Sequence, residues 1–78
     1  MGDLIAIFAV RLRQLRNERG WTQEDLAHAV KLSPRYVGQM ERQQASPSIR
    51  VLGRLAQALK VEPEDLLRRK RSTERAKV

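Results

Sequence analysis

Arg35 and Gln39 carry side chains that can recognise nucleic-acid bases, and they lie four residues apart. The Arg35 guanidinium can donate to O6 and N7 of guanine together, and the Gln39 amide can form a pair of hydrogen bonds with adenine. Residues four apart share one side of an α-helix, so both side chains would face the same groove of DNA. Two alternatives stay open: Arg35 binds a phosphate, or Gln39 is exposed at the far edge of the groove.

The pattern around these residues predicts two short helices joined by a tight turn. Thr22 and Asp25 have the spacing of an N-terminal capping box, and Ser33 followed by Pro34 provides a second N-cap with proline at the first helical position. The apolar period of the first helix breaks between them, at residues 31–32. Such a pair can lay its second helix, the recognition helix, in a major groove while the first braces it. Capping and periodicity alone suit an ordinary helical hairpin equally well.

Residue identity separates these two interpretations. The stretch from Thr22 to Arg42 resembles the helix-turn-helix of the Cro/C1-type family of bacterial and phage transcriptional regulators, also called the xenobiotic-response-element family. The resemblance rests on Thr22-Gln23, Leu26-Ala27, Leu32-Ser33, Tyr36-Val37 and Met40-Glu41-Arg42, and it extends over about residues 8–67. It implies an all-α fold, namely a compact five-helix lambda-repressor-like domain, with double-stranded DNA as its partner.

The resemblance also assigns roles to individual positions. It pairs an arginine near the end of the first helix with a glutamate late in the recognition helix, which here are Arg16 and Glu41. It makes Gln23 an anchor for a DNA phosphate, because a side-chain amide and a helix N-terminus can donate to one phosphate oxygen. The alternative for Gln23 is a plain surface glutamine. Dimer contacts are implied at residues 60–67, where Leu67 lies either across a two-fold axis or in the core of its own protomer.

Three further residues at the start of the recognition helix are expected at the DNA backbone. Ser33, Pro34 and Tyr36 should lie against the sugar-phosphate wall or a thymine methyl group. The Tyr36 ring can also pack in the core while its hydroxyl reaches a phosphate. The resemblance leaves both uses of this tyrosine open.

The chain departs from the family pattern at two places. Residues 43–47 lack the glycine and lysines that often follow the recognition helix, so phosphate contacts are expected from backbone N–H groups, from Ser46 or Ser48, and from Arg42 and Arg50. Gly38 lies in the middle of the recognition helix, where glycine costs about 1 kcal/mol relative to alanine. Either tertiary contacts hold the helix, or the glycine permits close approach to DNA.

Three other helices are predicted, over residues 4–19, 48–59 and 63–67. The first should end with Gly20 as its C-cap, and Ile7 and Val10, which lie off its core stripe, cover either the chain's own C-terminal helix or a subunit interface. The expected core residues of these helices are Ile5, Phe8, Leu12, Leu15, Val51, Leu52, Leu55, Ala56, Leu59 and Leu66.

Charge divides the chain into a predicted domain, residues 1–67, and a predicted disordered basic tail, residues 68–78. The tail holds six basic residues and one acidic residue, so it carries +5 of the net charge of +7. Within the domain, Arg35, Arg42, Arg50 and Arg54 fall in or just after the recognition helix, away from the acidic cluster at residues 62–65. This segregation predicts one basic face.

Several classes of protein are disfavoured. The apolar run at residues 4–10 is too short to span a membrane, and a basic residue follows rather than precedes it, unlike in a secretory signal. The chain has no cysteine, which fits a bacterial cytoplasmic protein. Its one histidine, His28, has no second histidine or cysteine to act with, and Glu24 and Asp25 point in different directions on a helix. We therefore expect no enzyme, cofactor, metal or small-molecule ligand.

The predicted function is a sequence-specific transcriptional regulator that binds a pseudo-palindromic operator as a homodimer, because one helix-turn-helix contacts too little DNA. The size resembles that of restriction-modification controller proteins, which we rank first, and of phage Cro-like repressors and antitoxins. The alternative is an antitoxin or other protein-interaction module that engages a partner through residues 4–10 and the recognition helix. Non-specific binding through the basic tail is a third hypothesis.

Overall fold

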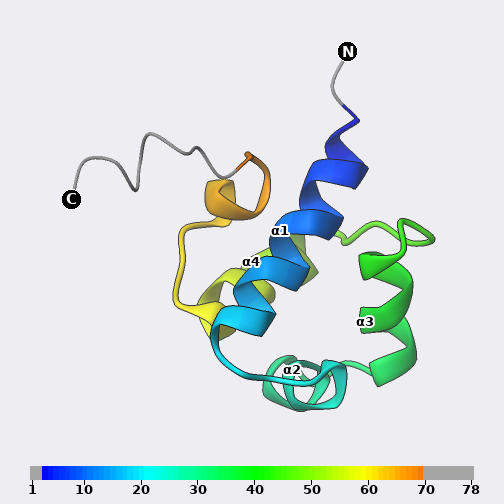
Figure 1. Ribbon diagram of the computed structural model, residues 1–78, viewed down its shortest axis with the longest axis vertical. Coiled ribbons are helices and arrows are strands. Elements are labelled where there is room, and N and C mark those ends of the chain that lie inside the picture. The colour runs from blue at the N-terminus through cyan, green and yellow to red at the C-terminus, as the bar shows by residue number, and fades with distance from the viewer. Residues whose placement is uncertain (1–2, 70–78) are drawn as a thin grey trace.

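The computed structural model describes residues 3–69 and contains four α-helices followed by one 3-10 turn (Figure 1). The elements are α1 (Leu4–Glu18), α2 (Gln23–Val30), α3 (Pro34–Glu41), α4 (Ile49–Leu59) and η1 (Pro63–Leu66). In Figure 1, α1 runs through the middle of the molecule, α3 flanks it on one side and η1 on the other, and α2 lies at its C-terminal end. Both α1 and α2 pack against α3, while η1 packs against α1 and α4.

The predicted fifth helix is wrong in type, so the five-helix domain becomes four α-helices and a 3-10 turn. The bonds at its two ends run from Asp65 N to Glu62 O (2.9 Å) and from Leu67 N to Glu64 O (3.0 Å), which is the three-residue spacing of a 3-10 helix. Only four residues are helical here, which is too short for a ladder of α-helical bonds, and such short pieces commonly adopt the 3-10 form. Leu66 is fully buried nonetheless, as expected.

Side chains cap the start of every α-helix, and the caps at Thr22, Ser33 and Ser48 are the predicted ones. Thr22 Oγ1 accepts from Asp25 N (3.0 Å) while Asp25 Oδ2 accepts from Thr22 N (2.9 Å), forming the predicted capping box. Ser33 and Ser48 each accept from the backbone N–H three residues on. These caps satisfy N–H groups that have no partner inside a helix.

The ends of α1 and α2 are set by left-handed residues. Gly20 has φ +70° and follows Arg19, which is the C-cap, so the predicted cap is displaced by one residue. Lys31 has φ 60°, and the next residue, Leu32, donates back to Ala27 O (2.9 Å). This reversal is the physical basis of the break in periodicity at residues 31–32.

The core lies where the four α-helices and η1 meet, and it matches the predicted apolar stripes with two exceptions. Ile5 and Val51 are only partly buried, and Ala9 takes a fully buried place on α1. The buried apolar side chains are Phe8, Leu12, Leu15, Leu26, Val30, Val37, Met40, Leu52, Leu55, Leu59 and Leu66. Val10 stays 44% exposed and Ile7 half-buried, so the outer face of α1 keeps some apolar surface.

Part of the predicted basic tail, and the question of a membrane-spanning helix, can be compared with the structure. Residues 70–78 of the predicted tail lie outside the described residues, and Arg68 forms an ion pair with Asp65 (2.6 Å). Among residues 3–69, no helix has the length and apolar character needed to cross a membrane.

Three arginines bind backbone carbonyls that are distant in the sequence, and one of them corrects the predicted basic face. Arg11 Nε donates to Asp65 O (2.9 Å), and Arg19 donates to Leu59 O. Arg54 Nη2 donates to Val30 O (2.5 Å) and to Lys31 O (3.3 Å). The last carbonyls of a helix lack internal partners and carry partial negative charge, so the end of α2 attracts this guanidinium. Arg54 therefore joins α4 to α2 and is not available to the basic face.

We expect Arg54→Met to lower the free energy of unfolding by about 1–3 kcal/mol, because the terminal carbonyls of α2 lose a charged donor. Urea denaturation followed by circular dichroism measures this loss. The matched control is Arg50→Met, since the Arg50 side chain is exposed on the same helix and should change stability by less than about 0.5 kcal/mol. Equal losses for the two variants would contradict the structural role of Arg54.

Candidate nucleic-acid interface

The outer face of α3 presents two polar side chains that are not committed to any internal contact. Arg35 is exposed and Gln39 is partly exposed, and neither side chain forms a hydrogen bond or ion pair within residues 3–69. The opposite face buries Val37 and Met40 completely. The structure therefore brings the two predicted base-reading residues to one accessible side of the helix.

The first turn of α3 places the next three predicted contact residues. Ser33 Oγ accepts from Tyr36 N (3.0 Å), and because a hydroxyl is also a donor, its hydrogen is left for another partner. Pro34 is exposed and has no donor. The Tyr36 ring packs against the core, which is one of the two predicted uses. Its hydroxyl donates to Ser46 O (3.3 Å) in the loop after α3, so this hydrogen is already bound within the protein.

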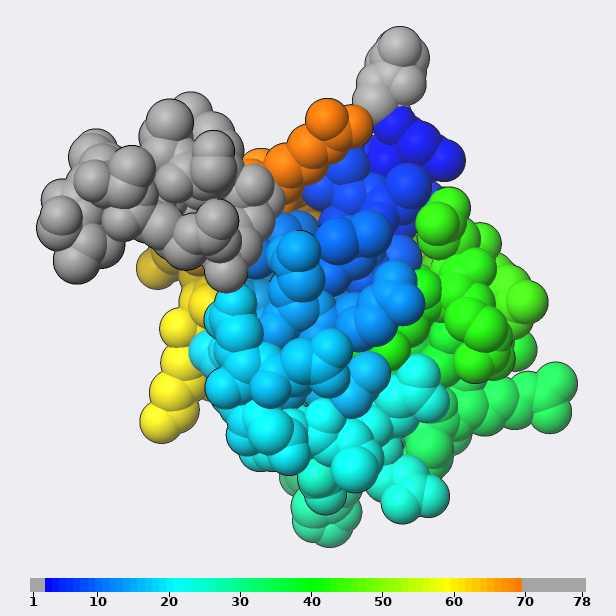
Figure 2. All heavy atoms as spheres, in the orientation of Figure 1, coloured from blue at the N-terminus to red at the C-terminus, as the bar shows by residue number. Residues whose placement is uncertain are grey.

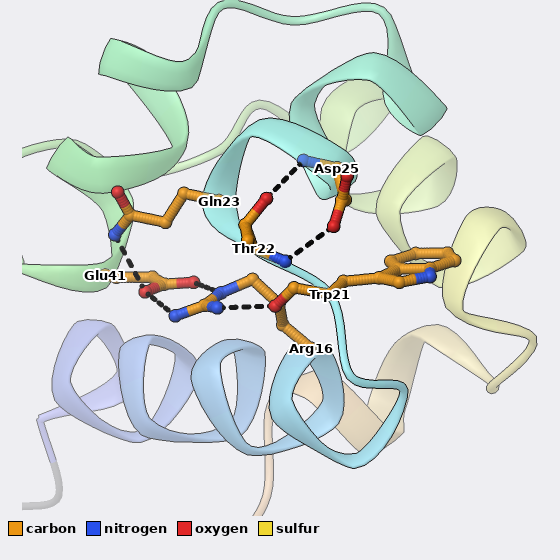
Figure 3. Close-up of polar contacts among 6 residues, drawn as sticks. All are labelled: Arg16, Trp21, Thr22, Gln23, Asp25 and Glu41. Carbon is orange, nitrogen blue, oxygen red and sulfur yellow. Dashed lines mark hydrogen bonds and ion pairs between the residues drawn. The ribbon is translucent and has the colours of Figure 1, made fainter.

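A buried carboxylate holds α3 to α1 (Figure 3). Glu41 accepts from Arg16 through two bonds, from Nε to Oε2 (2.7 Å) and from Nη2 to Oε1 (3.0 Å), and only 3% of its side chain is exposed. This is the pair that the family resemblance implied. A bidentate guanidinium-carboxylate pair fixes both distance and orientation, so it sets the position of the last turn of α3.

The same cluster extends to α2 through two contacts that the sequence did not predict. Gln23 Nε2 donates to Glu41 Oε1 (3.1 Å), and Arg16 Nη1 donates to the carbonyl oxygen of Trp21 (2.8 Å), just before the Thr22 cap (Figure 3). Gln23 is partly buried, so it is not a plain surface glutamine. The family resemblance gave a role to Gln23 and another to Glu41. It did not predict the hydrogen bond between them, because the two residues are eighteen positions apart and no local sequence pattern links them.

Electrostatics keep this cluster charged. Burial alone would raise the pKa of the Glu41 carboxyl, but hydrogen bonds from Arg16 and Gln23 and the nearby charges of Arg16 and Arg13 outweigh it and lower the pKa. The hydrogen bond to Glu41 likewise raises the pKa of Arg16. At the surface, the hydrogen bond from Arg68 lowers the pKa of Asp65. Glu41 is therefore ionised at neutral pH although it is buried.

The two predicted phosphate-binding arginines lie on either side of the loop at residues 43–47. Arg42 is the C-cap of α3 and is exposed, with Nε 3.4 Å from Gln44 Oε1, a long contact. Arg50 is exposed near the start of α4. In Figure 2, α2 (cyan to blue-green) at the bottom and α3 (green) at the right form one continuous surface, whereas the residues that follow α4 (yellow to orange) lie along the left edge and at the top. The contact surface of the helix-turn-helix is thus separate from residues 60–69.

Comparison with known proteins agrees with this arrangement. The model of a family described as helix-turn-helix matches residues 12–66. The HTH-type transcriptional regulator SutR of Escherichia coli is 38% identical over 61 residues, which are 78% of this chain and 34% of that protein. The HTH-type transcriptional regulator DdrOP3 of Deinococcus deserti is 40% identical over 57 residues, 73% of this chain and 44% of that protein. This chain spans less than half of the length of both relatives.

Two solved structures resemble the whole domain. The hypothetical transcription factor NHTF from Neisseria superposes with a TM-score of 0.84 at 35% identity, covering 96% of this chain and 84% of that one. The restriction-modification controller protein C.AhdI from Aeromonas hydrophila gives a TM-score of 0.76 at 42% identity, covering 80% of this chain and 94% of that one. At 35% and 42% identity, the likeness extends beyond the fold to the sequence.

We expect Glu41→Gln to lower the free energy of unfolding by about 3 kcal/mol at pH 7, because Arg16 is left partly buried without a counter-charge. The loss should depend on pH. A carboxyl with a lowered folded pKa stabilises the protein above its unfolded pKa of about 4.3, and this contribution disappears as the pH falls through the lower folded value. The difference between wild type and Glu41→Gln should therefore be constant from about pH 6 to 8 and narrow below about pH 4.3.

Urea titrations at a series of pH values measure this difference. Asp65→Asn is the control, since it removes the other carboxyl with a lowered pKa, at an exposed ion pair, and should leave the contribution of Glu41 unchanged. A difference between wild type and Glu41→Gln that stays constant down to about pH 3 would show that Glu41 does not carry this acid-sensitive stability.

Proposed function

The chain belongs to the helix-turn-helix family of Cro/C1-type transcriptional regulators, and on this basis we propose that it binds a pseudo-palindromic operator as a homodimer, with α3 reading the bases. One observation carries the proposal: Arg35 and Gln39 are free on the outer face of a helix whose inner face is fixed by buried contacts. A base-reading side chain gains specificity when the element that bears it is rigid, since a small displacement breaks a bidentate pair.

Arg35 and Gln39 are the proposed base-reading residues. The Arg35 guanidinium lies in the first turn of α3, at the end that enters the major groove in this arrangement, and it donates to O6 and N7 of a guanine. Gln39 lies one turn further and forms the paired hydrogen bonds with an adenine. Neither residue loses an internal hydrogen bond when it does so, because neither makes one within residues 3–69.

The other proposed contacts are to the DNA backbone. The Gln23 amide has two N–H donors and uses one for Glu41, so the other can donate to a phosphate beside the N-terminus of α2. The Ser33 hydroxyl hydrogen is similarly available. Tyr36 and Pro34 contribute their rings, since the Tyr36 hydroxyl is bound to Ser46 O and proline has no donor. Arg42 and Arg50 bind phosphates on either side of the loop.

An apolar surface supports the proposed homodimer. Ile49, at the start of α4, is 85% exposed, and Leu4 is 54% exposed. Between them runs a groove of about 200 Å³ that is also lined by Ile5, Pro47 and Leu67. The groove adjoins residues 60–67, where the family resemblance implies dimer contacts. We propose that a second copy covers this surface through a two-fold axis, so that each Ile49 faces the partner's groove.

We also propose which genes this regulator controls. The likeness to a restriction-modification controller protein, which covers most of both chains, supports a controller of restriction-modification genes. An antitoxin is the alternative. A neighbouring restriction or methyltransferase gene would support the controller, and a neighbouring toxin gene would support the antitoxin. In either case, we expect a protein of the bacterial cytoplasm.

We expect Arg35→Ala and Gln39→Ala each to weaken binding to the selected operator by about 1–3 kcal/mol per half-site and to relax discrimination at one base pair. Fluorescence anisotropy with the operator and with single-base variants measures both effects. Because the two side chains are free in the structure, circular dichroism and the melting temperature should not change. Unchanged binding by a folded variant would show that α3 does not read the DNA.

We expect Ile49→Glu to shift the protein from dimer to monomer, because two symmetric copies each lose apolar burial worth about 1.5–3 kcal/mol. Glutamate at the first position of α4 suits the positive end of the helix dipole, so the fold should be kept. Analytical ultracentrifugation measures the change. Val10→Glu is the control, as it alters an exposed apolar residue away from this groove. A dimer that survives Ile49→Glu but not Val10→Glu would place the interface on the face of α1 that carries Val10, away from this groove.

A further inference from the structure

Gly38 lies in the middle of α3, and the space that a side chain would occupy there is lined by two polar side chains. A Cβ atom built at Gly38 would lie 3.0 Å from Arg42 Nη1, 3.5 Å from Arg42 Cζ and 3.4 Å from Gln23 Oε1. Arg42 comes from one turn later in the same helix, and Gln23 comes from the first turn of α2. The glycine is buried by these neighbours, although its helix is a surface helix.

Gly53 provides an internal comparison, because it is the other glycine inside a helix of the described chain. It lies in α4, it is exposed, and a Cβ there would have no atom within 4 Å. Both glycines lower helix propensity to the same extent relative to alanine. Of these two glycines, only Gly38 has neighbouring side-chain atoms in contact with the space that a Cβ would occupy.

The conformation of Arg42 is the feature that depends on this space. Its guanidinium lies back over the preceding turn of α3 rather than extending beyond the end of the helix, so it approaches the first turn of α2. Within residues 3–69, its contact with Gln44 at 3.4 Å is long, and most of its N–H donors have no partner. The neighbouring Gln23 is held in place by Glu41 (3.1 Å). The Arg42 guanidinium and the oxygen of the fixed Gln23 amide thus both lie beside Gly38, next to the first turn of α2.

We propose that Gly38 is a positioning residue that keeps room for the Arg42 guanidinium, so that Arg42 and Gln23 bind the same DNA phosphate. This inference rests on the proposed function. Gln23 turns Oε1 toward Gly38 and donates one N–H to Glu41, which leaves its second N–H for a phosphate. Together with the Arg42 guanidinium and the N-terminus of α2, this donor favours an anion with several acceptor oxygens. Bases are read from the other positions, Arg35 and Gln39, whose side chains form no hydrogen bond with Gln23 or Arg42 within residues 3–69.

The first test compares Gly38→Ala with Gly53→Ala. Arg42 Nη1 is the far end of a flexible side chain, so a new methyl group at Gly38 should displace the guanidinium and leave the fold intact. Both variants should melt at or above the wild-type temperature, because alanine is the better helix former. Gly38→Ala should lose operator affinity by about tenfold per subunit, whereas Gly53→Ala should bind as the wild type does.

The second test is a double-mutant cycle. Arg42→Ala should weaken operator binding in the wild-type background and lower the slope of log affinity against log salt by about 0.9 per subunit. In the Gly38→Ala background, the same substitution should change affinity and slope little, because the guanidinium has already been displaced. Arg50→Ala is the control of equal charge, and its effect should be the same in both backgrounds.

The possible outcomes separate this inference from the proposed function. If the wild-type protein binds no specific duplex, the proposed function fails. If it binds but the effects of Gly38→Ala and Arg42→Ala simply add, Gly38 does not position Arg42 and the inference is wrong. A low melting temperature of Gly38→Ala that Arg42→Ala does not restore would also overturn it. If Arg42→Ala loses discrimination at one base pair, and the slope of its log affinity against log salt does not change, Arg42 reads a base and does not bind a phosphate.

Discussion

A charged carboxylate, Glu41, is buried where α1, α2 and α3 meet, and the arrangement of these helices depends on keeping it paired. Arg16 meets it with two bonds from α1 and reaches the Trp21 carbonyl with a third, while Gln23 meets it from α2. A buried ion pair adds little net stability compared with apolar residues, but it is expensive to break. Its directional bonds therefore act mainly to fix how α3 sits on the other two helices, and so where Arg35 and Gln39 point.

This constraint matters because α3 has little stability of its own. It is eight residues long, contains a glycine, and would not be helical in isolation. Its structure comes from Val37 and Met40 in the core, from the Ser33 cap and from the ion pair at its end. Because the inner face and the ends supply the stability, the outer face is free to carry side chains chosen for binding. Basic residues outside α3 also have structural roles, since Arg11, Arg19 and Arg54 each bind a backbone carbonyl of another element.

Local features of this protein could be predicted from its sequence because their causes are local. The capping box at Thr22, the Ser33 cap and the left-handed Gly20 each depend on residues within one helical turn. The Arg16–Glu41 pair was accessible only through family resemblance. Contacts between distant residues were missed, including Gln23 with Glu41 and Arg54 with the end of α2, because periodicity does not show which side chain crosses to another helix. The 3-10 form of η1 was missed since the pattern of apolar residues fits one short turn of either helix type.

The most direct test of DNA recognition by this protein is selection of bound sites from a randomised duplex pool at near-physiological salt, with sequencing of the recovered DNA. A homodimer that reads bases through two α3 helices predicts a two-fold symmetric motif, with half-sites whose centres are about ten base pairs apart. Recovery of no motif, together with binding that disappears as salt increases, would contradict sequence-specific recognition and leave only charge attraction to the phosphates.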